Sequence, residues 1–170
     1  MLIKTILNHT PTYGANCFFA DNATLIGDVV IGDYCSVWIQ AVVLGDVNRI
    51  FIGNNVNIQD GAVIHATYKT APTTIGNNVS IGHNSIVHGC TIYDNVLVGM
   101  GAIIMDNAVV ESDSIIAAGA VVTKNVIVPS GTVFGGVPAK KIKNTSTELK
   151  SGEIARIAKN YSLYASWFKG

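Results

Sequence analysis

A six-residue repeat is the feature that most limits how this chain can fold. From residue 98 onward, every sixth residue is large and apolar: Val98, Ile104, Val110, Ile116, Val122, Val128 and Phe134. An earlier run with the same spacing comprises Leu25, Ile31, Val37 and Val43. An α-helix would need apolar residues about 3.6 positions apart, whereas three hexads complete one triangular turn of a parallel β-helix. The spacing therefore predicts a mainly β fold, a left-handed parallel β-helix with the shape of a triangular prism.

Glycine followed by Asn or Asp recurs after many of the large apolar positions. Examples are Gly27-Asp28, Gly53-Asn54 and Gly76-Asn77. These residue types tolerate the positive φ angles that tight corners require, so we expect such pairs at the corners of the prism. A β-sandwich with evenly spaced strands is the alternative, but it gives no reason for a fixed six-residue step.

The repeat is interrupted three times, and all three interruptions lie between residues 49 and 92. Residues 49–51 add three positions, residues 69–74 contain a longer insertion, and the step from Val87 to Ile92 is one residue short. Insertions in repeat proteins project as loops from one face, which is often the functional face. Because three of the four histidines lie in this same part of the chain, we expect the functional site there.

After residue 140 the repeat ends and a helical pattern follows. Residues 145–148 (TSTE) resemble a capping box, and apolar residues then recur at helical spacing from about residue 151 to residue 168. We therefore expect a β-helix domain over residues 1–144 and a C-terminal α-helix over residues 145–170 that packs back along the prism.

The charge of the chain excludes several classes of partner. Eleven basic residues balance eleven acidic ones and the pI is near 6.9, so neither nucleic acid nor an anionic membrane is an expected partner. No apolar run approaches the roughly 18 residues of a membrane span, and the first residues lack the apolar stretch of a signal peptide. A cytoplasmic location is the resulting expectation. Only 13% of the residues are charged, which predicts that sister subunits cover part of the surface.

Two histidines occupy the same phase of the repeat on successive turns. Counting every third hexad onto one face stacks the hexads that begin at Val43, Ile64 and Val87, and His65 and His88 directly follow the last two. Stacked strands lie about 4.8 Å apart. Two imidazoles at that spacing can share one metal ion at nitrogen–metal distances of about 2.0–2.1 Å. The phase therefore predicts a metal site on this face.

The third histidine of the cluster, His83, falls on the neighbouring face. It lies two residues after Ile81, and five strand residues separate it from His88, which corresponds to more than about 10 Å. A third ligand from His83 must then come from another subunit, which predicts a homotrimer with one metal at each interface. Three neutral imidazoles favour Zn²⁺, and Fe²⁺, Co²⁺ or Ni²⁺ would also fit. The remaining histidine, His9, lies outside the repeat and is read as a surface residue.

These flanking sequences resemble the γ-class carbonic anhydrase family. The matching segments are residues 42–48 (VVLGDVN), 57–61 (NIQDG) and 81–92 (IGHNSIVHGCTI). The resemblance extends over roughly residues 10 to 140. It implies reversible hydration of CO₂ to bicarbonate, and it implies that zinc is bound by His65, His83 and His88.

The resemblance also implies roles for three further residues. Gln59 corresponds to the residue that orients the metal-bound water, and Asp46 and Asp60 correspond to residues that hold the site and the subunit contacts. One departure concerns residues 44–46 (LGD), where the family has Arg-Gly-Asp and an ion pair at the subunit interface. Leu44 cannot form this pair, so Asp46 needs another donor, and Arg49 is the nearest candidate. A second departure is that no glutamate-rich loop follows His65 to shuttle protons.

Two other functions remain open. Hexapeptide acyltransferases, which use acetyl-CoA, also contain the segment found at residues 135–140 (GGVPAK), and there a single histidine acts as general base. Three clustered histidines exceed that need. The other alternative is a non-catalytic metal-binding trimer. The sequence does not place Tyr161, on the expected helix, relative to the metal.

Overall fold

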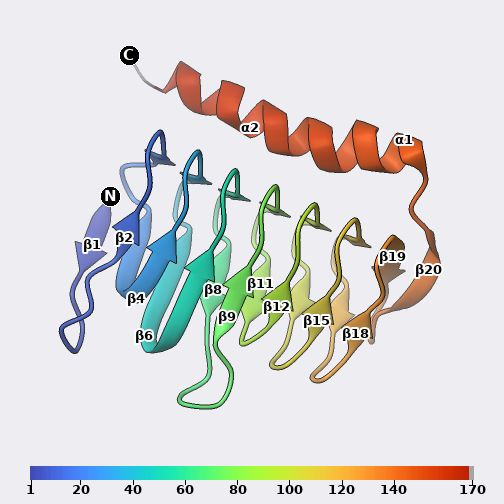
Figure 1. Ribbon diagram of the computed structural model, residues 1–170, viewed down its shortest axis with the longest axis horizontal. Helices are drawn as coiled ribbons and strands as arrows, with labels where there is room; N and C mark the ends of the chain where they lie inside the picture. Colours follow the sequence, from blue (N-terminus) through green and yellow to red (C-terminus); the bar gives the residue numbers. More distant parts are fainter. Residues whose placement is uncertain (169–170) are drawn as a thin grey trace.

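The chain folds as a parallel β-helix with one helical rod along its length (Figure 1). The computed structural model describes residues 1–168, so the last two residues of the predicted helix lie outside the described part. Strands from successive turns pair in parallel and in register, and they form three faces. The predicted parallel β-helix is therefore confirmed.

Faces 1 and 2 belong to one sheet that bends around a corner within its two longest strands, β4 (Thr24–Ile31) and β6 (Val42–Ile52). Face 1 contains the first halves of these strands and β1 (Leu2–Lys4), β8 (Val63–His65), β11 (Ile86–His88), β14 (Ile103–Ile104) and β17 (Val121–Val122). Face 2 contains their second halves and β2 (Thr12–Tyr13), β9 (Thr73–Ile75), β12 (Thr91–Ile92), β15 (Val109–Val110) and β18 (Ile127–Val128).

Face 3 is a separate sheet of eight strands. They are β3 (Phe18–Phe19), β5 (Ser36–Val37), β7 (Asn57–Ile58), β10 (Ser80–Ile81), β13 (Leu97–Val98), β16 (Ile115–Ile116), β19 (Thr132–Gly135) and β20 (Lys140–Asn144). The last of these, β20, pairs antiparallel with β19, whereas the others are parallel.

The large residue of each hexad points into the prism. Ile58, Ile81 and Val98 stack on one another in face 3, as Ile64 and Val87 do in face 1, and all are at most 1% exposed. Burying such a side chain stabilises the fold by about 1.5–3 kcal/mol relative to leaving it exposed. A continuous apolar core thus fixes the register of every strand, and with it the positions of the residues at the corners.

The corner between faces 2 and 3 differs from the prediction. Positive φ angles occur not at Gly53 and Gly76 but two residues later, at Asn55 (φ 55°) and Asn78 (φ 55°). Gly53 is needed for another reason, because a Cβ atom there would lie 2.8 Å from the backbone of Gly76 on the next turn. Asparagine tolerates the left-handed conformation, and glycine permits the close approach of the stacked backbones.

The C-terminal rod consists of α1 (Thr147–Leu149), a π-helical segment (Lys150–Ala155) and α2 (Arg156–Trp167). Its N-cap is Ser146, whose side chain accepts a hydrogen bond from the backbone N–H of Leu149 at 3.2 Å. The cap therefore lies one residue after Thr145, the first residue of the predicted capping box. The rod runs back along the prism (Figure 1), where Trp38 of the turn after β5 packs edge-on against Tyr161 at 5.2 Å between centroids.

Within residues 1–168, no helix is long and apolar enough to cross a bilayer.

Candidate metal centre

His65 and His88 end adjacent strands of face 1. They are register partners in the pairing of β8 with β11, as the hexad count predicted. Nδ1 of His65 lies 3.1 Å from Nε2 of His88, and the two ring centroids are 5.0 Å apart. The two imidazoles therefore present one nitrogen each to a common point.

The other nitrogen of each ring faces a carboxylate. Nε2 of His65 lies 3.1 Å from Oδ1 of Asp46, and Nδ1 of His88 lies 2.6 Å from Oδ1 of Asp106. A carboxylate accepts a hydrogen bond from a ring N–H, so a neutral imidazole held in this way carries its lone pair on the opposite nitrogen. Both lone pairs then point into the 3.1 Å gap, an arrangement that a cation between the rings would stabilise.

The spacing fits a zinc ion. Two nitrogen ligands at about 2.0–2.1 Å from a tetrahedral Zn²⁺ are about 3.3 Å apart, close to the 3.1 Å between the facing nitrogens. Imidazole also suits Fe²⁺, Co²⁺ and Ni²⁺. Carboxylates that hold the far nitrogen of a ligating histidine are a regular feature of metal sites, because they set the tautomer and the ring orientation.

His83 has the same kind of partner but lies on face 3, in the turn after β10. Its Nδ1 lies 2.9 Å from Oδ2 of Asp60, and its Nε2 lies 3.4 Å from the hydroxyl oxygen of Tyr161 on α2. Burial, together with the nearby charges of Asp60 and Tyr164, raises the pKa of Tyr161 to about 12, so its hydroxyl is protonated at neutral pH. Among the described residues of one chain, no three His, Cys, Asp or Glu side chains are grouped to hold an ion.

Gln59 is buried beside His83. Its Nε2 donates to Oδ1 of Asn57 at 3.0 Å, and Nδ2 of Asn57 donates to Oγ of Ser80 at 2.7 Å. A cavity of about 380 Å³ is lined by Gln59, His83 and Tyr161, among others. The structure thus brings three of the predicted site residues, Gln59, Asp60 and His83, together at the end of face 3.

Within a single chain, Asp46 contacts His65, and no ion pair joins it to Arg49 within residues 1–168. Both residues line a small cavity of about 200 Å³. Within one chain, the ring N–H of His65 is thus the donor that contacts the Asp46 carboxylate.

Asp106 was missed by the sequence reasoning. Burial alone would raise its pKa, but hydrogen bonds from His88 and Thr67 and the electrostatic interactions with His88 and Lys124 outweigh burial, so the pKa is lowered. The signal was present: Ile104, two residues before Asp106, stacks directly on Val87. Extending the hexad count one turn beyond His88 places Met105 opposite it and Asp106 one residue further along.

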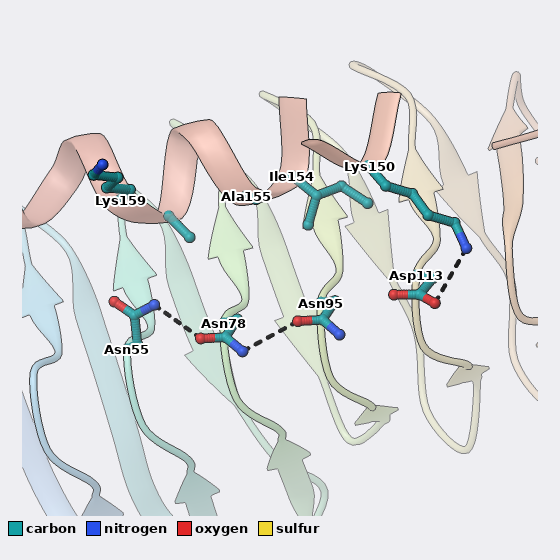
Figure 2. A pocket seen from close by; sticks show the side chains of 9 residues that line it. Asn55, Asn78, Asn95, Asp113, Lys150, Ile154, Ala155 and Lys159 are labelled. Carbon is teal, nitrogen blue, oxygen red and sulfur yellow. Dashed lines mark hydrogen bonds and ion pairs between the residues drawn. The ribbon is translucent and has the colours of Figure 1, made fainter. Parts of the chain in front are cut away.

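A larger cavity lies at the opposite end of the face 3 strands. Its volume is about 470 Å³, and its floor is a ladder of corner side chains in which Asn55 Nδ2 donates to Asn78 Oδ1 (2.9 Å) and Asn78 Nδ2 to Asn95 Oδ1 (3.1 Å) (Figure 2). An ion pair between Lys150 and Asp113 at 3.2 Å joins this corner to the helical rod. No histidine lines this cavity, so it is separate from the metal centre.

The sequence is similar to several known proteins. Residues 89–124 match the repeat family described as "Bacterial transferase hexapeptide (six repeats)". The chain is 41% identical over 160 residues to "Carbonic anhydrase" of Geobacillus kaustophilus, covering 94% of this chain and 87% of that protein. It is 41% identical over 164 residues to "Gamma carbonic anhydrase 2, mitochondrial" of Arabidopsis thaliana and 51% identical over 87 residues to "Probable carbonic anhydrase" of Methanocaldococcus jannaschii.

The matches cover most of this chain, with one exception. The Arabidopsis match includes 94% of this chain and the Methanocaldococcus match 51%. The chain spans only 59% and 54%, respectively, of the lengths of these two relatives.

Solved structures agree with the fold over nearly the whole chain. A hexapeptide transferase family protein from Anaplasma phagocytophilum superposes with a TM-score of 0.93 at 38% identity, covering 98% of both chains. A putative acetyltransferase from Bacillus cereus superposes with a TM-score of 0.95 at 33% identity, covering 99% of this chain and 96% of that one. With relatives of this identity and coverage, the chain belongs to the γ carbonic anhydrase family of hexapeptide-repeat proteins.

Proposed function

We propose that this protein is a zinc-dependent carbonic anhydrase that catalyses the reversible hydration of CO₂ at the subunit interfaces of a homotrimer. One observation carries the proposal: His65 and His88 aim one nitrogen each at a common point, while Asp46 and Asp106 hold their other nitrogens. The names of the Geobacillus and Arabidopsis relatives support the reaction.

The interface follows from the position of His83. His65 and His88 leave room for further ligands, but His83 of the same chain is on another face, so His83 of a neighbouring subunit supplies the third nitrogen. Face 1 is suited to be covered in this way. A ladder of outward-facing aliphatic side chains runs across it: Val42, Val63, Ile86, Ile103 and Val121.

Leu44 lies on the same outward side of face 1 as Val42. The replacement of the family arginine therefore extends an apolar strip. We infer that apolar burial replaces the missing ion pair at this interface.

The residues of the site divide the chemistry between them. When bound, zinc lowers the pKa of a coordinated water from about 15.7 toward about 7. Asp46, Asp60 and Asp106 hold the three imidazoles in the tautomers that leave the ligating nitrogens unprotonated. The buried amide of Gln59 and the protonated hydroxyl of Tyr161 lie on the His83 side, where they orient the reacting water and the oxygens of CO₂ by hydrogen bonds.

Two measurements on purified protein test the proposal. Elemental analysis should find close to one zinc per chain, and stopped-flow assays should find CO₂ hydration that a chelator abolishes and zinc restores. Fully metallated protein without chelator-sensitive hydration would contradict the proposed activity. Metal binding in a trimer without CO₂ turnover would instead identify the protein as a non-catalytic metal-binding trimer.

Acyl transfer from acetyl-CoA is the second candidate, favoured by the name of the Bacillus cereus structure and by residues 135–140. That reaction needs one histidine as general base, whereas here three histidines each contact a carboxylate. Release of free thiol from acetyl-CoA in the presence of a panel of hydroxyl and amine acceptors would establish this alternative.

A further inference from the structure

We propose that Asp106 is the principal positioning residue of the metal centre, locked by Thr67 and Lys124 so that it fixes the ring of His88. The inference rests on the proposed function, because it assigns Asp106 its role through a metal ligand.

The contact between Asp106 and His88 differs from the other two carboxylate–histidine contacts in length and in burial. It is 2.6 Å long, against 3.1 Å for Asp46 with His65 and 2.9 Å for Asp60 with His83. The Asp106 side chain is 13% exposed, whereas those of Asp46 and Asp60 are 33% and 39% exposed. A short charged hydrogen bond away from solvent is screened least, so His88 is the most firmly held of the three rings.

Both oxygens of the Asp106 carboxylate have partners. While Oδ1 contacts His88, Oδ2 accepts a hydrogen bond from Oγ1 of Thr67 at 2.9 Å and lies 3.6 Å from Nζ of Lys124. These partners come from three different turns of the prism, with Lys124 in the turn after β17. Rotation of the carboxylate would break contacts on both oxygens, so its orientation is fixed.

The insertion after β8, the long loop that extends beyond the prism in Figure 1, supplies Thr67. Two contacts hold the backbone of Thr67 in place. Nδ2 of Asn48 donates to the Thr67 carbonyl oxygen at 3.0 Å, and Thr67 forms an antiparallel bridge with Ala71. The register break around residues 69–74 therefore has a structural role at the site. Thr67, at the start of the loop that contains this break, donates its hydroxyl to the carboxylate that orients His88.

The expected consequence concerns metal affinity. Without Asp106, the His88 ring can rotate and can carry its proton on Nε2, the nitrogen that faces His65. Loss of such a carboxylate partner lowers metal affinity about 10- to 100-fold. Asp106→Ala should therefore bind Zn²⁺ about 10- to 100-fold more weakly than the wild type.

The experiment measures Zn²⁺ affinity by competition with a chromogenic chelator and records the visible absorption spectrum of the Co²⁺-substituted protein. Asp106→Asn keeps an oxygen that can accept from His88, so its affinity should lie between those of Asp106→Ala and the wild type. Thr67→Val and Lys124→Met should each weaken binding by a smaller factor. Asp113→Asn is the matched control, because it removes a carboxylate paired with a lysine far from the histidines and should change nothing.

The outcomes separate this inference from the proposed function. Wild-type protein that binds no zinc would contradict both. Wild-type protein that binds zinc, with unchanged affinity and an unchanged Co²⁺ spectrum in folded Asp106→Ala, would overturn the role of Asp106 alone. If Asp106→Ala does not fold, Thr67→Val and Lys124→Met decide, and unchanged affinity in both would overturn the inference.

Discussion

Nδ1 of His65 and Nε2 of His88 face each other at 3.1 Å from adjacent turns of the prism, while a carboxylate holds the far side of each ring. Two lone pairs directed at one point repel each other until a cation lies between them. In the proposed zinc site these two nitrogens would be two of the ligands of a tetrahedral ion, and His83 of a neighbouring subunit would supply the third.

Subunit complementation tests whether the ligands come from two chains. We expect His83→Ala protein and His65→Ala/His88→Ala protein each to bind less than a tenth of the wild-type zinc. In mixed trimers, formed by refolding the two together, some interfaces combine an intact His83 with an intact His65–His88 pair and should regain zinc, measured by elemental analysis. If His83→Ala alone retained one zinc per chain, His83 would not be a ligand.

A charge on face 1 should disrupt the trimer. Ile86 is 37% exposed in the single chain and lies in the middle of the aliphatic ladder. Ile86→Lys places an ammonium group in the proposed interface, so we expect dissociation in analytical ultracentrifugation and loss of zinc. Ile127→Lys on face 2, where the side chain is 61% exposed, is the control and should leave the trimer intact. A trimeric Ile86→Lys protein would show that face 1 is not the interface.

Removing the Tyr161 hydroxyl should affect catalysis more than metal binding. Tyr161→Phe keeps the edge-on packing against Trp38 but removes the group that lies 3.4 Å from Nε2 of His83. A lost hydrogen bond of about 1 kcal/mol corresponds to a decrease in the rate of CO₂ hydration of about fivefold. Zinc affinity should stay within about twofold. Loss of zinc in this variant would indicate that the hydroxyl supports the metal site instead.

A substitution that creates a cavity in the core, away from the histidines, should lower the stability of the fold and leave zinc binding unchanged. Ile116 on face 3 is fully buried and packs between turns of the prism. Ile116→Ala should lower the free energy of unfolding by about 2–5 kcal/mol, measured by urea denaturation. Zinc content per folded chain should be unchanged. Exposed Ile127 gives the comparison, because Ile127→Ala should change stability by less than about 0.5 kcal/mol.

The repeat alone determined much of the fold and part of the site. A prism of three hexads per turn has a fixed geometry, so counting positions was enough to predict that His65 stacks on His88. The corners were harder to predict, because the positive φ lies at Asn55, whereas Gly53 is required by its close approach to Gly76 on the next turn. Hexad spacing contains no information about such contacts between turns.

The position of Tyr161 required the three-dimensional structure for a different reason. Its approach to His83 depends on where the helical rod lies on face 3, and the rod is held by aromatic contacts such as that with Trp38. Amphipathic spacing predicts that a helix packs somewhere on the prism, but it does not set the helix's position along the axis. Three expectations stay predictions: the three histidines as metal ligands, zinc as the metal, and the trimer.

The antiparallel strand β20 has a consequence for how the molecule behaves at high concentration. A solenoid that ended in an open parallel edge could accept the first turn of another molecule, and such additions would grow into fibres. Here the last strand of face 3 is β20, which runs in the reverse direction and carries Lys140, Lys141 and Lys143. Docking of a second molecule at this edge would remove these ammonium groups from water, which is unfavourable, so we expect association through the sides of the prism.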